Sequence, residues 1–142
     1  MRARILLLLA AAACGCSARS SRPPLEMRAA WARPADSAAS TAAYFVLVNR
    51  GPVAVMLVRE SSPIAEAVGL HQTMNVDGTA HMSAVDAPLA VASGDSLVLK
   101  PGGRHLMVSG LTRRLAGGDS LPLLLHFAGG LTLPTLAVIR AP

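Results

Sequence analysis

The feature that most constrains the fold is a series of short apolar segments separated by tight-turn signals. The clearest signal is Asp77-Gly78, which separates residues 71–76 from residues 79–84. Both turn positions accept a positive φ, as a two-residue β-hairpin requires. Similar segments recur at intervals of roughly 8 to 12 residues, a spacing typical of antiparallel β-sandwiches and barrels. We therefore expect an all-β domain.

Three further pairs of segments are predicted to be hairpins, because Gly or Pro turn residues separate their two halves. They are residues 41–51 with 52–61, residues 95–100 with 104–111, and the two halves of residues 121–139. The chain has 142 residues, enough for one domain. Hydrophobic residues make up 52% but aromatic residues only 3%, so the core must consist mainly of Leu, Val, Ala and Met.

The N-terminal residues have the pattern of a secretory signal. Arg2 and Arg4 precede an apolar run that ends at Ala13, too short to span a bilayer as a helix, which takes about 20 residues. Because Cys14 directly follows this run, residues 1–13 are predicted to be a lipoprotein-type signal peptide cleaved before a lipidated Cys14. Cys16 is a second candidate, and an ordinary cleaved signal that frees a soluble protein is the alternative.

Residues 14–25 are small, polar and rich in Ser and Pro, and they predict a flexible tether. Residues 26–142 then form the domain, in a periplasmic or otherwise extracytoplasmic location, with a possible lipid anchor in the membrane. Removal of residues 1–13 would lower the formal charge from +5 to +3. This charge is too mild to indicate a nucleic-acid partner, and no basic cluster with aromatic residues supports one.

The candidate chemistry lies in two groups of His and Met residues. His105 and Met107 are two residues apart in a predicted strand, so their side chains share a face. In the hairpin about Asp77-Gly78, Met82 is opposite Thr73, diagonal to His71, and Met74 is directly opposite His81. These two pairs lie on opposite faces of the hairpin. Sequence parity alone does not say which face joins His105 and Met107.

Two imidazoles and two thioethers suit Cu(I), because thioether sulfur is a soft neutral ligand and imidazole is borderline. Zinc sites prefer Cys, His and carboxylate, and Ca²⁺ and Mg²⁺ prefer oxygen. Both Cys residues precede the domain, so it lacks the thiolate of a blue-copper electron-transfer site. An alternative is that the Met residues fill the core and the His residues are surface or hydrogen-bonded groups, as we expect for His126. No nucleophile elbow or carboxylate pair indicates an enzyme.

The chain resembles the PCuAC-type periplasmic copper chaperones, whose motif is a His, about ten residues, a Met, about twenty-one residues and then His-x-Met. Here ten residues separate His71 from Met82, and twenty-two separate Met82 from His105-Leu106-Met107. The segments that also match are AWARPADSAASTAAYFVLVNRG (30–51), SSPIAEAVGLHQ (61–72), AVD (84–86) and LKPGGRHLM (99–107). The resemblance covers most of residues 28–139.

The resemblance implies a cupredoxin-like antiparallel β-sandwich of Greek-key type. It also implies one Cu(I) bound by His71, Met82, His105 and Met107, which leaves Met74 and His81 as a possible secondary metal pair. The implied function is a monomeric chaperone that delivers copper by ligand exchange to the binuclear copper site of cytochrome oxidase, through an oxidase subunit or its assembly factor. Copper storage or tolerance is an alternative, as is a structural or assembly lipoprotein that binds no metal.

Overall fold

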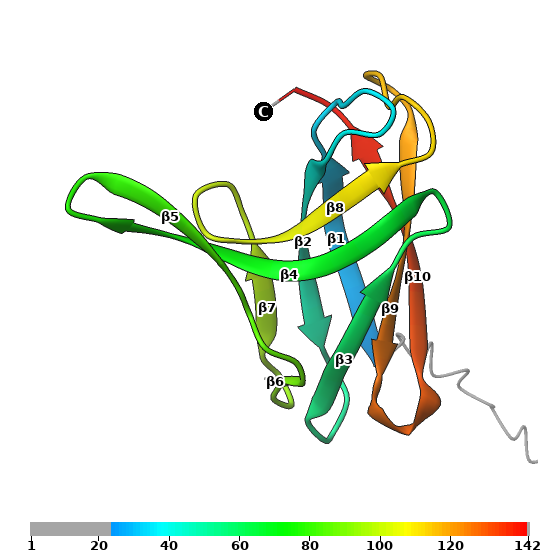
Figure 1. Ribbon diagram of the computed structural model, residues 1–142. Coiled ribbons are helices and arrows are strands. Elements are labelled where there is room, and N and C mark those ends of the chain that lie inside the picture. Colours follow the sequence, from blue (N-terminus) through cyan, green and yellow to red (C-terminus); the bar gives the residue numbers. More distant parts are fainter. Residues whose placement is uncertain (1–23, 142) are drawn as a thin grey trace, which may run out of the picture.

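Ten β-strands provide the regular structure of residues 24–141, the part of the chain that the computed structural model describes (Figure 1). They are β1 (Leu25–Ala32), β2 (Thr41–Asn49), β3 (Val55–Ser61), β4 (Ala65–Val76), β5 (Thr79–Ala84), β6 (Leu89–Val91), β7 (Ser96–Leu99), β8 (Arg104–Leu111), β9 (Ser120–Phe127) and β10 (Thr132–Ile139), with a short 3-10 turn η1 (Ala128–Gly130) before β10. The predicted signal peptide 1–13 and Cys14 lie outside the described residues. β1 begins one residue before the expected domain boundary.

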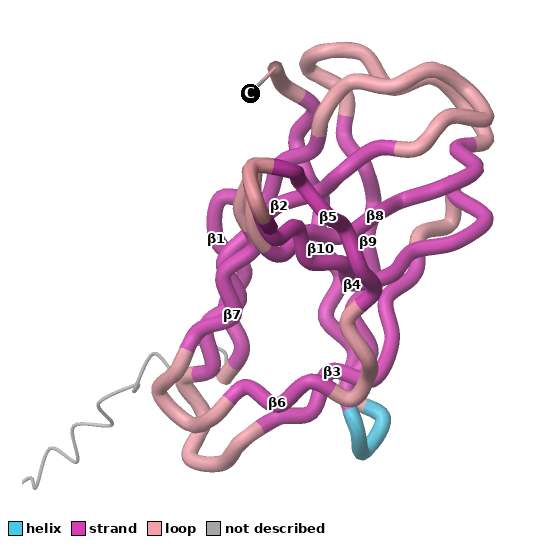
Figure 2. The backbone as a smooth tube through the Cα atoms, turned by 60° about the vertical axis from the view of Figure 1, so that its left-hand side comes forward, coloured by secondary structure: helices cyan, strands magenta, loops and turns pink. Residues whose placement is uncertain are grey.

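The strands form one hydrogen-bonded path in the order β5-β4-β8-β2-β1-β10-β9-β3-β6, and β7 pairs with β2. The path folds over on itself, so that its two halves enclose the core (Figures 1 and 2). Neighbouring strands are antiparallel except β1 and β10, which run parallel. The predicted all-β sandwich is confirmed.

Strand periodicity builds the core. Along β9 every second side chain is buried, namely Leu121, Leu123, Leu125 and Phe127. Burial of each such side chain is worth about 1.5–3 kcal/mol relative to exposure. Leu side chains are the commonest members of the core cluster, as expected for a chain with so few aromatic residues.

The predicted hairpin between residues 41–51 and 52–61 is wrong. β2 pairs with β1, β7 and β8, whereas β3 pairs with β6 and β9. The intervening turn therefore carries the chain from one half of the sandwich to the other. Asn49 fixes this crossing, because its buried side chain donates to the carbonyls of Val53 and Val91 and accepts from the N–H of Gly51.

The predicted reversal between residues 95–100 and 104–111 is also wrong. β7 and β8 both run antiparallel to β2, with Leu99 opposite Phe45 and Leu106 opposite Ala43. They are thus two parts of one line of chain beside β2, interrupted by a loop. The loop closes through a hydrogen bond from the N–H of Lys100 to the carbonyl of Arg104, at 2.8 Å. The Pro and Gly turn residues form a loop that leaves the sheet between β7 and β8, and β8 then continues in the direction of β7.

The other two hairpins are confirmed. Asp77 and Gly78 have φ values of 52° and 80°, and the β4–β5 hairpin that they close projects from the sandwich (Figure 1). β9 and β10 pair around η1, with Pro134 opposite Leu124. No helix in the described part of the chain is long and apolar enough to cross a membrane.

Candidate metal centre

The two predicted imidazoles meet on neighbouring strands. His71 of β4 is directly opposite His105 of β8, and their ring centroids are 6.1 Å apart. The neighbouring cross-strand pair, Leu70 and Leu106, is buried in the core. Because side chains alternate along a strand, both His residues lie on the outer face of the β4–β8 pair.

Hydrogen bonding orients the His105 ring. His105 is 5% exposed, and its Nδ1 lies 3.0 Å from the carbonyl oxygen of Gly103. A carbonyl only accepts, so in the neutral ring Nδ1 carries the proton and Nε2 carries the lone pair. Gly103 belongs to the loop between β7 and β8, and its carbonyl also accepts from the N–H of Thr73 on β4. The loop thus fixes both the tautomer and the direction of His105.

The lone pair of His105 faces sulfur. Nε2 lies 3.2 Å from Sδ of Met82, and in this tautomer both atoms are electron-pair donors. A tetrahedral metal with bonds of about 2.0 Å to nitrogen and about 2.3 Å to sulfur holds two such atoms about 3.5 Å apart. Nε2 of His105 and Sδ of Met82 therefore need to move apart only slightly to bind a cation between them.

Met82 reaches this position because of the hairpin register. It is opposite Thr73, and His71 is opposite Ala84, so Met82 is diagonal to His71 on the same face, as predicted from the sequence. Its side chain is 51% exposed, in contrast to the buried His105. One donor of the candidate centre is thus accessible from solvent.

His71 contributes an unpaired nitrogen. Its Nδ1 is the one buried side-chain nitrogen or oxygen without a hydrogen-bond partner among the described residues. A buried polar atom left unpaired costs about 1–3 kcal/mol. A cation bound beside this ring would offset that cost.

Met107 lies two residues beyond His105 on β8, hence on the same face, and it is half-buried. Its cross-strand neighbours are Gly69 on β4 and Ala42 on β2, and both are small. The thioether therefore has room to turn toward the two imidazoles.

Gly69 is a residue whose role sequence reasoning missed. A Cβ built at this position would lie 3.7 Å from Nε2 of His71. The missing side chain leaves open the space between His71 and Met107. An isolated glycine within a strand pattern is the signal that could have identified it, because it often marks a close approach.

A cluster of tilted aromatic rings next to His105 was also missed. The Tyr44 ring centroid is 6.4 Å from that of His105 and 4.6 Å from that of Trp31. The guanidinium of Arg33 lies 5.8 Å from the Tyr44 centroid, and that of Arg140 lies 4.7 Å from the Trp31 centroid, both within cation–π range. Tyr44 is buried, so the aromatic cluster shields one side of the His105 ring from water.

The other predicted candidates are separate from this centre. Met74 and His81 are directly opposite one another, on the hairpin face away from Met82. His126 accepts or donates at 2.8 Å from Oγ of Ser61, which confirms its reading as a hydrogen-bonded residue. Within residues 24–141, no group of three or more His, Cys, Asp or Glu side chains is placed to hold a metal.

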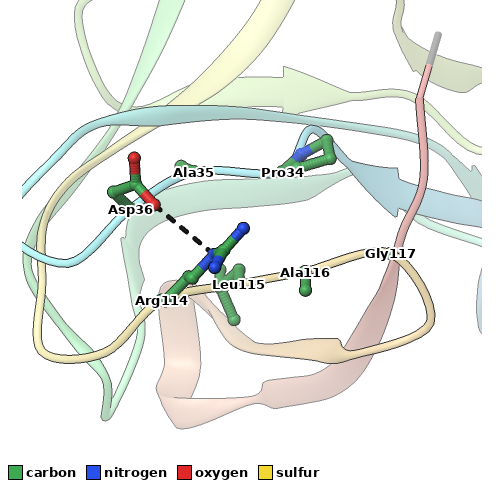
Figure 3. Close-up of a pocket in the computed structure, with 7 residues that line it drawn as sticks. All are labelled: Pro34, Ala35, Asp36, Arg114, Leu115, Ala116 and Gly117. Carbon is green, nitrogen blue, oxygen red and sulfur yellow. Dashed lines mark ion pairs between the residues drawn. The ribbon is translucent and has the colours of Figure 1, made fainter.

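A surface hollow elsewhere contains none of the candidate donors (Figure 3). Its two charged side chains, Asp36 and Arg114, form an ion pair at 3.4 Å. Its walls are two loops joined by the isolated bridge between Ala35 and Leu115. This hollow is therefore separate from the candidate metal centre.

The described residues form a small β-sandwich with candidate imidazole and thioether donors at its rim. The chain belongs to the LpqE-like family, described as "Putative lipoprotein LpqE-like", whose sequence profile matches residues 25–139. It is 29% identical over 116 residues to "Putative lipoprotein Lxx21020" of Leifsonia xyli subsp. xyli. That alignment covers 82% of this chain and 69% of the relative.

Solved structures show the same fold. The apo PCuAC domain of PmoF1 superimposes with a TM-score of 0.68 at 22% identity, covering 84% of this chain and 96% of that domain. The solution structure of the Cu(I) form of DR1885 from Deinococcus radiodurans gives a TM-score of 0.59 at 28% identity, covering 87% of this chain and 83% of that one. The resemblance to the PCuAC-type family is confirmed.

Proposed function

We propose that this protein is an extracytoplasmic copper chaperone that binds one Cu(I) through His71, Met82, His105 and Met107. The 3.2 Å approach of Nε2 of His105 to Sδ of Met82 is the observation that carries the proposal. Two electron-pair donors in contact, beside a second imidazole with an unpaired nitrogen, support a cation site between these side chains. The similarity to the Cu(I) form of DR1885 supports copper as that cation.

The donor set explains the choice of oxidation state. All four donors are neutral, and thioether sulfur is soft, so the set favours Cu(I) over harder divalent ions.

Transfer would proceed by ligand exchange. The exposed Met82 is the donor that an incoming ligand reaches first, while the buried His105 keeps its bond to copper. A thioether leaves without taking up a proton, so each exchange step moves Cu(I) between neutral donors without a change in oxidation state. The protein binds and transfers its cargo and needs no catalytic residue.

The acceptor we propose is the binuclear copper site of cytochrome oxidase, reached directly or through an assembly factor. Lipidation of Cys14, with residues 14–25 as a tether, would hold a monomeric domain near such a membrane partner. The lipoprotein descriptions of the family and of the Leifsonia relative support the lipid anchor.

Anaerobic Cu(I) titration of the full chain against a colorimetric chelator tests the proposal. Cys14→Ser and Cys16→Ser form the background, so that no thiolate competes for copper. We expect one tightly bound equivalent, which His71→Ala with Met82→Ala abolishes. The matched control is Met56→Ala with His126→Ala, which removes the same two residue types elsewhere and should leave the tight equivalent intact. Equal binding by both double variants would refute the assignment.

Transfer is tested separately from binding. The copper-loaded chain is mixed with an apo binuclear copper domain of a cytochrome oxidase, and the visible absorption of the assembled centre is followed. Growth of that absorption supports delivery, whereas retention of copper by the chain would support storage instead.

A further inference from the structure

We propose that Met74 and His81 form a second, exposed Cu(I) site on the opposite face of the β4–β5 hairpin. It would take Cu(I) from a carrier and pass it to the centre at His71 and His105. This inference rests on the proposed function, because an entry site matters only if the main centre binds the same ion.

The hairpin register places the two donors together. Met74 and His81 are a directly opposed pair, and the Cβ atoms of such pairs lie about 4.5–5.5 Å apart. A thioether and an imidazole at that spacing can both reach a single ion. Cu(I) is suited to this pair because one donor is soft and the other borderline.

Both donors are free to bind. Met74 is 50% exposed, and His81 is also exposed. Among the described residues, no hydrogen bond or ion pair engages the His81 ring, unlike the rings of His105 and His126. Met74 is absent from the core cluster and from the side chains packed against it. Packing within the described chain therefore explains neither side chain.

The edge position of β5 provides a route between the two faces. β5 ends the strand order and pairs only with β4, and its six residues are all exposed. His81 and Met82 are consecutive, so they point to opposite faces of this edge strand. An ion held by His81 can pass round the open edge to Met82, which already lies against His105.

The exchange balances without a redox partner. The carrier gives up a Cu(I)–ligand bond as the Met74 sulfur and a neutral His81 nitrogen form theirs. Met82 and then His105 replace those donors, and copper stays monovalent throughout. With two donors in place of four, we expect the entry site to bind at least about tenfold more weakly, equivalent to about 1.4 kcal/mol.

The test is anaerobic Cu(I) titration of the full chain in the Cys14→Ser, Cys16→Ser background, with one strong and one weak chelator. Cuprous glutathione is the carrier in a parallel stopped-flow measurement of loading. We expect a tight equivalent with the strong chelator and a second equivalent with the weak one. Met74→Leu with His81→Gln should remove only the second equivalent and slow loading several-fold. Both substitutions are at exposed positions, so folding should be unaffected, and circular dichroism checks this.

The controls separate this inference from the proposed function. Met56→Leu with His126→Gln should retain both equivalents, and His71→Ala with Met82→Ala should retain only the weak one. A chain without the tight equivalent would refute the proposed function. A single equivalent with the weak chelator, or a second one that survives Met74→Leu with His81→Gln, would refute the entry site alone. Unchanged loading of that variant would refute its role in transfer.

Discussion

The two imidazoles and the Met82 sulfur of the candidate centre sit in very different surroundings. His71 and His105 belong to β4 and β8 within the sandwich, where His105 is 5% exposed and is held by the Gly103 carbonyl. Met82 belongs to the projecting β4–β5 hairpin and is 51% exposed. The His105 ring is thus held in place by the loop before β8, whereas one sulfur is carried by an edge strand.

The contrast suggests how one centre can both hold and release an ion. The His105 imidazole is already oriented, so binding requires little further ordering of this side chain. The Met82 donor can swing away without disturbing the core, because β5 has a neighbour on one side only. We therefore expect the two sides to differ in function, with His105 setting affinity and Met82 setting the exchange rate.

Removal of His105 should have the largest effect. Loss of supporting residues around a metal typically costs 10–100-fold in affinity, so His105→Ala should weaken Cu(I) binding by at least about 100-fold. Chelator competition measures this loss. His126→Ala is the matched control, since His126 bonds to Ser61 and should not affect binding. A loss below tenfold would contradict the central role of His105.

Met82→Ala should have a smaller effect on affinity than on kinetics. We expect about tenfold weaker binding, equivalent to about 1.4 kcal/mol, together with release to a chelator that is faster than in Met107→Ala. Stopped-flow release in excess chelator measures both variants. If Met107→Ala released copper faster than Met82→Ala, exposure of the Met82 sulfur would not be what controls the exchange rate.

Gly69 tests whether the space beside His71 matters. An alanine Cβ would make an ordinary contact, 3.7 Å from Nε2 of His71, so Gly69→Ala should change the affinity less than about threefold, or under about 0.7 kcal/mol. The branched side chain of Gly69→Val would enter the space next to Met107 and should weaken binding more. Equal affinities of the two variants, measured by chelator competition, would show that the space is not used.

Local sequence pattern was sufficient to predict the relative placement of the candidate ligands within the β4–β5 hairpin and within β8. Asp77-Gly78 fixes a two-residue turn, and a two-residue turn fixes the register that brings Met82 diagonal to His71. Alternation on β8 likewise predicts that His105 and Met107 share a face. The choice of His71 and Met82 over Met74 and His81 came from family resemblance, because parity cannot tell which hairpin face continues from β8.

Tertiary pairing accounts for what local pattern missed. A turn between two apolar segments can return the chain beside itself or carry it to the other half of a sandwich, and the buried hydrogen bonds of Asn49 decide for crossing. The sequence before β8 suggests a hairpin turn, because Pro and Gly residues occur both in hairpin turns and in loops that interrupt a strand without reversing it. The contact of Tyr44 with His105 joins β2 to β8, two strands that are far apart in sequence, and no local pattern indicates it.

The smallest predicted effect lies far from the centre and isolates stability from binding. Glu26 on β1 forms ion pairs with Arg28 and with Arg50 beyond the end of β2, at 2.8 and 2.6 Å. Hydrogen bonds from Arg28 and then Arg50 lower the pKa of Glu26 from 4.5 to about 2. A carboxylate with a lowered pKa adds stability that is complete above pH 4.5 and is lost as the pH falls toward 2.

Glu26→Gln should therefore destabilise the fold slightly at neutral pH, since exposed ion pairs contribute little. The difference from the unsubstituted chain should shrink as the pH falls from 4.5 to 2, which urea denaturation at several pH values measures. Glu60, whose pKa burial raises, titrates in both proteins and cancels from the difference. Cu(I) affinity at neutral pH should be unchanged, because the pairs lie at the start of β1, away from His105. A constant stability difference across this pH range would disprove the role of the Glu26 charge, and weakened Cu(I) binding would show that fold stability and the centre are coupled.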